Sequence, residues 1–239
     1  MKDNKENKKT KSAALGSRGR KPARKGEPVG RQSGKPKRSA PEKGEEKRIQ
    51  LSGERVELKG GAMLSPLPAV MVTVGNGERD NIITIGWCGI LSTDPPRAYI
   101  SVRPQRHSFK LLSENGEFVM NLTTEALARA TDFAGIYTGA KMDKFEKLGL
   151  TRVKSKQVLP PSILESPLSI ECRVFQVVES GTHHIFMADI VAVTADSALF
   201  DGGRLCLDRA GLISYAHGEY FATGRKLGKF GFSTDKKKK

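Results

Sequence analysis

The sequence has no long uninterrupted run of apolar residues. A membrane-spanning helix needs about 20 mainly apolar residues in succession, so none is expected. A secretory signal needs a shorter apolar core behind a positive start, and Ala13-Ala14-Leu15 is too short even for that. We therefore expect a cytoplasmic protein without membrane contact.

Cysteine is also scarce. Cys88, Cys172 and Cys206 are the only three, they are widely spaced, and none belongs to a C-x-x-C motif. This argues against both a disulfide framework and a zinc site, and it fits a reducing cytosol. A lone cysteine in an apolar strand is more often a small core residue than a catalytic thiol. We expect no metal.

Aromatic residues are absent from the first fifty positions. Residues 1–50 contain no Phe, Trp or Tyr and carry 17 Lys and Arg against 6 Asp and Glu. Such a segment cannot bury enough apolar surface to offset the entropy of ordering, so it is predicted to be a disordered basic tail. Residues 51–235 carry equal numbers of acidic and basic side chains and form the predicted domain. Residues 236–239 are four lysines and form a second basic tail.

Short runs rich in Val, Ile and Thr open this domain. Residues Ala69–Val74 and Asn81–Trp87 are predicted strands, separated by the turn signal Gly75-Asn76-Gly77. Two prolines, Pro95-Pro96, exclude a central strand at that point, and Ala98–Arg103 follows as a third strand. Three strands so close in sequence predict an antiparallel meander.

The rest of the domain alternates β segments with short helices. Further strands are predicted over Glu117–Leu122, Leu168–Val178, His184–Thr194, Arg204–Leu207 and Tyr220–Ala222, with a hairpin turn at Glu179–Thr182. Helices are predicted over Phe109–Asn115 with Ser108 as N-cap, over Thr124–Phe133 and over Asp143–Leu148. This is a mainly β domain with short helices (α+β), and a closed or partly closed barrel would remove its unpaired strand edges.

The segment Arg103–Ser108 gathers groups that suit a phosphate. It offers two guanidinium groups, an imidazole, a hydroxyl and the backbone N–H groups of a helix start within six residues. A helix start combined with fork-shaped cationic donors is the usual way to hold a phosphate monoester. An ordinary basic loop with a helix cap is about as consistent with this segment taken alone.

The segment Thr84–Gly89 adds a place for a flat ligand. It brings a hydroxyl, a large aromatic ring and two glycines to a break in a strand, where the backbone can approach a ring closely. A single tryptophan is usually a core residue. The conjunction of this break, the Arg103–Ser108 cluster and Asn121 on a later strand favours a binding site.

At this point the sequence resembles the flavin reductase-like proteins of the FMN-binding split-barrel fold, including the flavoredoxin branch. The resemblance covers nearly all of Pro66–Ser233 and rests on the order and spacing of several elements. These are Asn81-x-x-Thr84-x-Gly86-Trp87, Pro95-Pro96, Ser101-Val102-Arg103-Pro104-x-Arg106-His107-Ser108, Gly116–Leu122, Asp143-Lys144-Phe145, Gly181–Phe186 and Tyr220-x-x-x-Gly224. The resemblance implies an antiparallel, Greek-key type split β-barrel that forms a homodimer.

The same resemblance implies roles for individual residues. It places Thr84, Trp87, Cys88 and Gly89 along the isoalloxazine ring, and Ser101, Arg103, Arg106, His107 and Ser108 around the ribityl phosphate. Asn121 would support the same wall, and Lys144 and Phe145 would reach the cofactor of a partner subunit. His183 matches the histidine of the reductases' Gly-Asp-His pattern on the nicotinamide side. Thr182 replaces the Asp of that pattern, His184 competes for the role, and a hairpin histidine bonded to backbone is nearly as consistent.

Several functions remain open from the sequence. The leading one is an FMN-dependent oxidoreductase that takes hydride from NADH or NADPH and passes electrons to a small molecule or a redox protein. The second is a flavoredoxin-type electron carrier or flavin-holding module without nicotinamide turnover of its own. Nucleic-acid binding by the basic N-terminal tail is a weaker alternative, because that tail lacks interleaved aromatics. A pyridoxamine-phosphate oxidase uses a related barrel, but its substrate signatures are not visible here.

Overall fold

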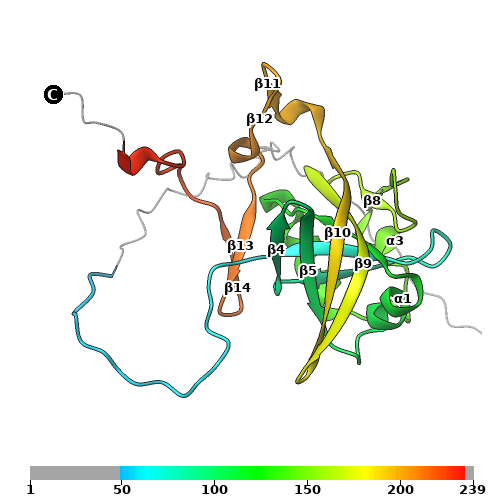
Figure 1. Ribbon diagram of the computed structural model, residues 1–239, viewed down its shortest axis with the longest axis horizontal. Coiled ribbons are helices and arrows are strands. Elements are labelled where there is room, and N and C mark those ends of the chain that lie inside the picture. The colour runs from blue at the N-terminus through cyan, green and yellow to red at the C-terminus, as the bar shows by residue number, and fades with distance from the viewer. Residues whose placement is uncertain (1–48, 235–239) are drawn as a thin grey trace, which may run out of the picture. The chain divides into compact units, whose positions relative to one another are not determined.

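The structure is a computed structural model that describes residues 49–234 (Figure 1). The chain divides into two compact units, Met1–Leu58 and Lys59–Lys239. Residues 49–58, the described part of the first unit, contain no helix or strand. The predicted tails, apart from Ile49 and Gln50, lie outside the described residues, as does the proposal that the N-terminal tail binds nucleic acid. The fold described below is that of the second unit.

This unit is mainly β, as predicted. Its strands are β1 Leu67–Pro68, β2 Val70–Val74, β3 Asn81–Ile85, β4 Cys88–Thr93, β5 Pro96–Val102, β6 Glu117–Asn121, β7 Arg152–Val153, β8 Ser162–Ile163, β9 Leu168–Ser180, β10 His183–Ala195, β11 Phe200–Asp201, β12 Arg204–Leu205, β13 Ile213–Ala216 and β14 Glu219–Ala222. Its α-helices are α1 His107–Asn115, α2 Ala128–Ile136 and α3 Lys144–Leu148. Four 3₁₀ turns add η1 Glu125–Leu127, η2 Ser197–Leu199, η3 Leu207–Arg209 and η4 Phe232–Thr234. No helix among residues 49–234 is long and apolar enough to cross a membrane.

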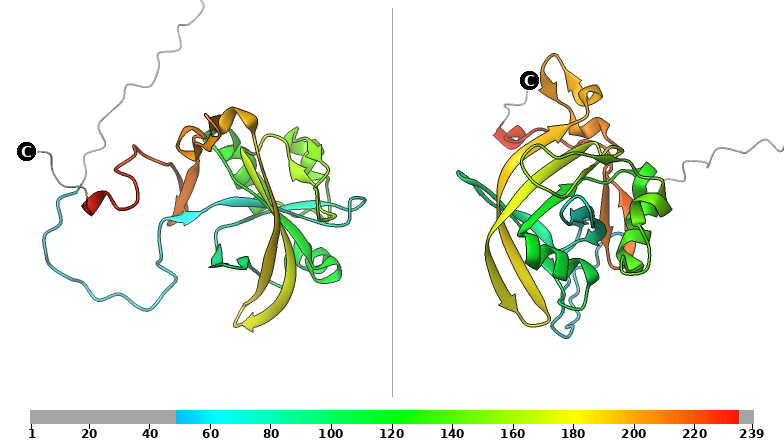
Figure 2. Two further views of the ribbon diagram at one scale, coloured as in Figure 1. Left: turned by 45° about the horizontal axis from the view of Figure 1, so that its top comes forward. Right: turned by 90° about the vertical axis from the view of Figure 1, so that its right-hand side faces the viewer.

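Seven strands form one antiparallel sheet in the order β3-β2-β6-β9-β10-β5-β4. Its two edge strands, β3 and β4, are joined by only Gly86 and Trp87. In a flat sheet six strand spacings would separate the edges by about 29 Å, whereas this link spans about 11 Å at most. The sheet must therefore curl into a barrel. The backbone N–H of Ser101 donates to the Trp87 carbonyl at 2.9 Å, which extends the β4–β5 pairing into the link. Figure 2 shows the strands curling around a common interior.

Alternating side chains of these strands fill the barrel. Because successive residues of a strand point to opposite faces, every second residue enters the interior. On β5 these are Ala98, Ile100 and Val102, all nearly free of solvent exposure. The remaining core residues are Val70, Val72, Val74, Ile83, Ile85, Cys88, Leu112, Phe118, Met120, Cys172, Phe186 and Ala188.

Strands β2 and β3 are buried on their second face as well, because α2 and α3 pack against them. Met71 and Ile82 belong to a separate apolar cluster with Phe145 of α3. In this outer layer α2 packs against β3. The hydroxyl of Thr84 on β3 donates to the Thr131 carbonyl of α2. The arrangement places α2 over the strand that leads to Trp87.

Strand β1 and the two C-terminal strands form a smaller, three-stranded sheet in the order β1-β13-β14. The hairpin β13–β14, orange in Figure 1, is held by the pairing of Leu67 with Tyr215 and Pro68 with Ser214. A hydrogen bond from the Ile213 N–H to the Thr123 carbonyl adds a further anchor. The hairpin is thus attached to the segments that enter β2 and leave β6.

Most predicted elements are confirmed, and four details are wrong. Strand β4 was not predicted, and β5 pairs with β10 and β4 rather than completing a meander with β2 and β3. Arg106, not Ser108, is the N-cap residue of α1, and Ser108 lies inside the helix. The helix predicted from Thr124 begins as the turn η1, and α2 then continues to Ile136. The left-handed Gly116 and Gly149 end α1 and α3, directly after the predicted helix ranges.

Candidate functional site

Two adjoining cavities lie where β3, α1, α2 and the β13–β14 hairpin meet. The larger has a volume of about 350 Å³ and the smaller about 100 Å³. Ile83, Arg106 and Gly135 line both, so the cavities are neighbours with a shared wall. Together they form one continuous candidate site in which the two parts differ in chemistry.

The smaller cavity is basic. Arg106, His107 and Lys144 line it, and its described lining includes neither Asp nor Glu. The other residues around it are Asn81, Ile83, Gln105, Ser108, Ala134, Gly135, Tyr137, Thr138 and Gly139. Unopposed positive charge next to the first turn of α1 is suited to an anion.

Arg106 stands at the junction of the two cavities. As the N-cap residue of α1 it has extended backbone angles, with φ −75° and ψ 136°. Its guanidinium Nη1 donates to the Gly135 carbonyl of α2 at 3.3 Å. A guanidinium carries five N–H donors, so this bond orients the group and leaves donors for a ligand.

Lys144 is a buried cation with no carboxylate partner in the described chain. Its side chain amine donates to the Ile82 carbonyl at 2.7 Å and to the Ala134 carbonyl at 2.8 Å. Only 3% of Lys144 is exposed. Burial, and then the charge of Arg106, lowers the pKa of Lys144 to about 8. An ammonium has three N–H donors, so the two carbonyls leave one for a ligand.

Asn81 forms the inner wall of the smaller cavity. Its amide nitrogen donates to the Ser108 hydroxyl at 2.7 Å. Its amide oxygen is buried without a donor among the described residues. A Cβ at Gly139 would lie 2.0 Å from that oxygen, so only glycine fits there. A buried acceptor without a partner is costly, and a ligand that donates a hydrogen bond would satisfy it.

The larger cavity has an aromatic side formed by Trp87 and His183. Their ring centroids lie 4.7 Å apart with an interplanar angle of 41°. Trp87 is 43% exposed, which is high for a single tryptophan in a small domain. Burial, and then the charge of Arg103, lowers the pKa of His183 below its ordinary value of 6.5. His183 is therefore a neutral imidazole at physiological pH, and its Nδ1 lies 2.9 Å from the Thr182 hydroxyl.

A carboxylate and two phenol groups also line the larger cavity, and they come from segments that the sequence analysis did not assign to a site. Asp132 of α2 lines the larger cavity, as do Tyr215 and Tyr220 of the β13–β14 hairpin. The two tyrosine rings form an edge-to-face pair with centroids 5.3 Å apart. Gly218 and Ile136 complete this side of the wall.

The cavities bring together most of the residues expected at the site. Those that line one or both of them are Thr84, Trp87, Ser101, Arg103, Arg106, His107, Ser108, Lys144 and His183. His184 does not; it packs edge-on against Phe109 with centroids 5.0 Å apart. The structure thus places His183, rather than His184, at the larger cavity.

Four expected residues do not reach either wall. Cys88 lies in the barrel core, where burial raises the pKa of its thiol to about 12. A Cβ at Gly89 would meet the Tyr99 ring at 2.9 Å, so that glycine is needed for packing. Asn121 is fully buried and bonded to the Met71 carbonyl, among others. Phe145 is fully buried beneath the Arg152 guanidinium, which lies 4.1 Å from the ring centroid.

The expected reach of Lys144 and Phe145 into a partner subunit stays a prediction, and within the described chain both side chains are buried. Both side chains point into their own chain, because Lys144 is bound by two carbonyls of the same chain and Phe145 fills the cluster beneath α2. Lys144 instead lines the smaller cavity of its own subunit.

The sequence reasoning missed Asn81, Asp132, Gly135, Gly139, Tyr215 and Tyr220 as wall residues. Asn81 and Tyr220 belong to the elements that carried the resemblance, so a signal for them was present. For Asp132 and Tyr215 no local pattern marks the residue, and only the packing of α2 and the hairpin brings them to the cavity.

An antiparallel barrel that carries a basic cavity beside an aromatic one fits a ligand with an anionic group and a flat ring. The flavin reductase like domain matches residues 63–224, and the chain belongs to that family. It is 39% identical over 139 residues to an uncharacterized protein of Archaeoglobus fulgidus. This alignment covers 58% of this chain and 78% of the relative. It is 29% identical over 146 residues to the NADH-dependent FMN reductase of Streptomyces nodosus subsp. asukaensis, covering 60% and 77%.

Solved structures give the same picture of the fold. The flavoredoxin of Desulfovibrio vulgaris (Miyazaki F) superimposes with a TM-score of 0.71 at 29% identity, covering 76% of this chain and all of that one. A flavoredoxin from Methanosarcina acetivorans gives a TM-score of 0.70 at 20% identity, covering 76% and 98%. The split-barrel fold expected from the sequence is confirmed.

Proposed function

We propose that this protein binds FMN and transfers hydride from NADH or NADPH to it, passing the electrons on to a second acceptor. The observation that carries the proposal is the pair of adjoining cavities, one basic without acidic lining and one aromatic. The likeness to an NADH-dependent FMN reductase and to a flavoredoxin supports the flavin as the ligand.

The residues present fit this cofactor. Arg106 and Lys144 supply cationic donors for the phosphate in the smaller cavity, and His107 adds an imidazole. The hydroxyls of the ribityl chain are the kind of donor that the amide oxygen of Asn81 lacks. The larger cavity offers Ile83 and Trp87 as surfaces for a flat ring. When bound, FMN supplies the hydride chemistry, and the protein supplies position and electrostatics.

The chain's own residues then have distinct tasks. Arg106 is held by the Gly135 carbonyl and fixes the phosphate relative to α2. Trp87 and His183 stand at the open side of the larger cavity, where a nicotinamide ring would enter. His183 is neutral at physiological pH and can donate or accept one hydrogen bond without adding charge. Positioning of the two rings, rather than proton transfer, is therefore its proposed task.

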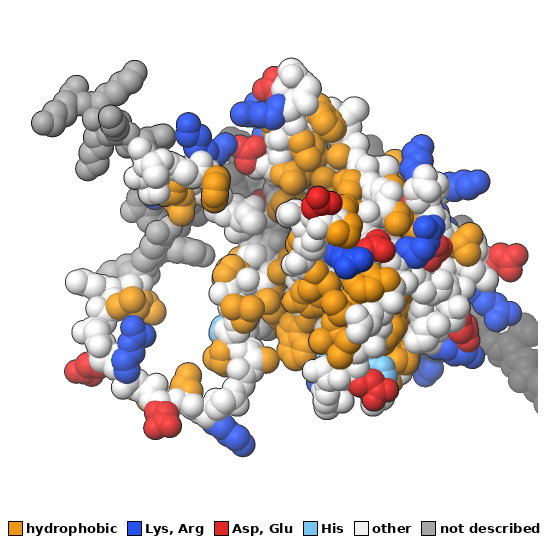
Figure 3. All heavy atoms as spheres, in the orientation of Figure 1, with side chains coloured by type: hydrophobic (Ala, Val, Ile, Leu, Met, Phe, Trp, Pro, Cys, Tyr) orange, Lys and Arg blue, Asp and Glu red, His pale blue; other side chains and the backbone are white. Residues whose placement is uncertain are grey.

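A homodimer is part of the proposal. Figure 3 shows hydrophobic side chains gathered over the face formed by β4, β5, β10 and β9. Ile90 and Leu91 of β4 are 59% and 44% exposed, and Phe175 and Val177 of β9 are 41% and 47% exposed. An apolar face of this kind on a small domain marks an interaction surface, and two-fold dimers are the commonest oligomers. Light scattering should give a mass in solution of twice the chain mass. In Ile90→Glu the measured mass should fall to that of a single chain.

The alternative is an electron carrier that holds FMN without oxidising a nicotinamide itself, and the flavoredoxin likeness favours it. One experiment separates the two. Purified protein with FMN is mixed with NADH or NADPH, and absorbance at the reduced-nicotinamide band is followed. Steady oxidation supports the reductase. A flavin that is reduced by light but not by either nicotinamide, even at high concentration, supports the carrier. Protein that does not retain FMN contradicts both.

A further inference from the structure

The amide oxygen of Asn81 is the single buried side-chain polar atom within residues 49–234 that has no hydrogen-bond partner. Asn81 begins β3, is 4% exposed and lines the smaller cavity. Ser108 lies beside it, is 2% exposed and lines the same cavity. The contacts of these two side chains indicate which ligand atoms they select.

Asn81 and Ser108 are fixed against each other by two separate elements. The Asn81 amide nitrogen donates to the Ser108 hydroxyl oxygen at 2.7 Å. Asn81 is held by the pairing of β3 with β2, and Ser108 is held in the first turn of α1. Because the nitrogen faces Ser108, the oxygen of the same amide faces away from it. There a Cβ on Gly139, another residue that lines the cavity, would collide with the oxygen.

The pair therefore offers the smaller cavity one acceptor and one donor. The acceptor is the unpartnered oxygen of Asn81. The Ser108 hydroxyl accepts the bond from Asn81, so its own O–H proton remains to be donated. Arg106 and Lys144 line the same cavity and attract an anion. Such a set suits a ligand that presents an anionic group and a hydrogen-bond donor side by side.

Turning the Asn81 amide over gives a different set. Its oxygen would then accept the Ser108 proton, and its NH₂ group would face the cavity, which would offer donors alone and suit a phosphate without a hydroxyl. Side-chain amide dipoles orient in the local field. The cations Arg106 and Lys144 on the cavity wall therefore favour the orientation in which the oxygen faces the cavity.

We propose that Asn81 and Ser108 recognise a phosphate monoester together with the hydroxyl on the neighbouring carbon. The Asn81 oxygen accepts from that hydroxyl, while the Ser108 hydroxyl donates to a phosphate oxygen. The inference rests on the proposed function, because FMN carries such a hydroxyl on ribityl carbon 4′, next to the carbon that bears the phosphate. Asn81 lines the smaller cavity and not the larger one, so the hydroxyl nearest the phosphate is the one it meets.

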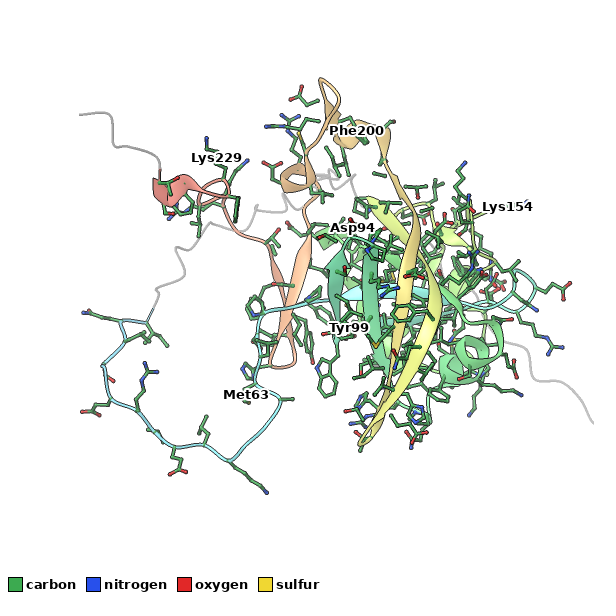
Figure 4. All side chains as sticks on the ribbon, viewed as in Figure 1. Met63, Asp94, Tyr99, Lys154, Phe200 and Lys229 are labelled. Carbon is green, nitrogen blue, oxygen red and sulfur yellow. The ribbon has the colours of Figure 1, made fainter. Side chains whose placement is uncertain are left out.

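The experiment compares FMN with two analogues that each lack one of the recognised groups. 4′-Deoxy-FMN lacks the hydroxyl, and riboflavin lacks the phosphate. Dissociation constants are measured by flavin fluorescence for the full-length wild type, Asn81→Ala and Ser108→Ala. Asn115→Ala is the control for loss of an amide, and Tyr99→Phe on β5 (Figure 4) is the control for loss of a hydroxyl. Neither control residue lines a cavity.

The wild type should bind 4′-deoxy-FMN roughly tenfold more weakly than FMN, because the analogue leaves a buried acceptor unpaired. In Asn81→Ala this ratio should fall below about threefold, while the preference for FMN over riboflavin stays as in the wild type. Ser108→Ala should reduce that preference by roughly tenfold, the effect of one hydrogen bond to a charged group. Asn115→Ala and Tyr99→Phe should keep both ratios.

Three results would overturn the proposal. The first is equal binding of FMN and 4′-deoxy-FMN by the wild type. The second is a hydroxyl ratio that persists in Asn81→Ala; if the preference over riboflavin falls there instead, the amide donates to the phosphate. The third is an unchanged preference for FMN over riboflavin in Ser108→Ala.

A second variant covers a failure of Asn81→Ala to fold, which circular dichroism detects. The three atoms nearest to a Cβ on Gly139 all belong to the Asn81 amide, so Gly139→Ala displaces the oxygen from a loop outside the sheet. It should lose the hydroxyl ratio in the same way, and retention of the ratio would overturn the proposal. Wild-type protein that binds no FMN would contradict the proposed function itself, so the two failures are distinguishable.

Discussion

The two cavities share three wall residues but are built in different ways. The smaller is basic, and four of its residues, Gln105–Ser108, come from one continuous segment. The larger draws on β3, β5, α2, β10 and the β13–β14 hairpin, and it contains aromatic rings, the guanidinium groups of Arg103 and Arg106, and one carboxylate. The comparison suggests a division of tasks within one site. Charge in the smaller cavity would supply affinity for a ligand, and the larger cavity would supply selectivity for its ring. A phosphate can be held by charge alone, whereas a ring must be recognised by shape and by the edge it presents.

The proposed division predicts its largest effect at Arg106, which belongs to both cavities. Arg106→Ala should weaken FMN binding by roughly 10- to 150-fold, the loss of one charge-assisted hydrogen bond worth about 1.5–3 kcal/mol. Fluorescence titration measures it. Lys110→Ala on the same helix removes an exposed cation that pairs only with Glu114 at 3.7 Å, and it should change the affinity by less than about twofold. Yellow Arg106→Ala protein after dialysis would contradict the phosphate assignment.

Lys144 makes the basic cavity sensitive to pH. Its pKa is lowered to about 8. In the ligand-free site Lys144 is therefore charged below pH 8 and loses its charge above that pH. The dissociation constant of FMN should be flat near pH 7 and should rise by up to about tenfold per pH unit above 8. Lys144→Met should bind FMN more weakly at pH 7 and lose this rise. An identical pH profile in both proteins would exclude Lys144 from the clamp.

The same lysine should affect stability in the opposite direction. Because the folded pKa is about 8 and the ordinary value is 10.5, the unfolded chain holds a proton between these values that the folded chain does not. The free energy of unfolding of ligand-free protein should therefore rise with pH over this window, by an amount on the order of 3 kcal/mol. Below pH 8 the cost of the buried charge is fully present. Urea unfolding should show the rise in the wild type but not in Lys144→Met.

His183 tests the aromatic side of the larger cavity. His183→Ala removes one face of the Trp87 pair, and KM for the nicotinamide should rise by roughly three- to tenfold, the range of one contact or hydrogen bond, while FMN affinity stays unchanged. His184→Ala is the adjacent control, since that ring packs on Phe109 outside both cavities. Equal effects of the two substitutions would mean that the hairpin, not the imidazole, matters.

The smallest effect is expected at Cys88. Burial raises its pKa to about 12, so the side chain is a neutral thiol in the barrel core and not a nucleophile. Cys88→Ser should keep FMN and should change kcat by less than about twofold. A variant that binds FMN but no longer oxidises the nicotinamide would reopen thiol chemistry at this residue.

Local sequence was a good guide to elements and to groups that lie close together in the chain. The predicted strand Ala98–Arg103 corresponds to β5, and the predicted helix Asp143–Leu148 corresponds to α3 with its N-cap Asp143. Strand β4 was missed because Gly89 and the nearby prolines weaken its pattern, although it needs only one partner, β5, at the edge of the sheet. The segment Arg103–Ser108 could be predicted to hold a phosphate because its donors are close together in the chain and need no distant partner, and all but Pro104 of it lines one of the two cavities.

The sequence by itself determined the β-rich class, the short helices and the basic cluster, since each depends on neighbours within a few residues. The tertiary structure alone decided that a two-residue link joins the edge strands of the barrel, that Lys144 lines the smaller cavity, and that Asp132 and Tyr220 both line the larger cavity. These features join segments up to about ninety residues apart along the chain. Only packing of the whole core fixes such pairings, because no local pattern carries the position of a distant partner.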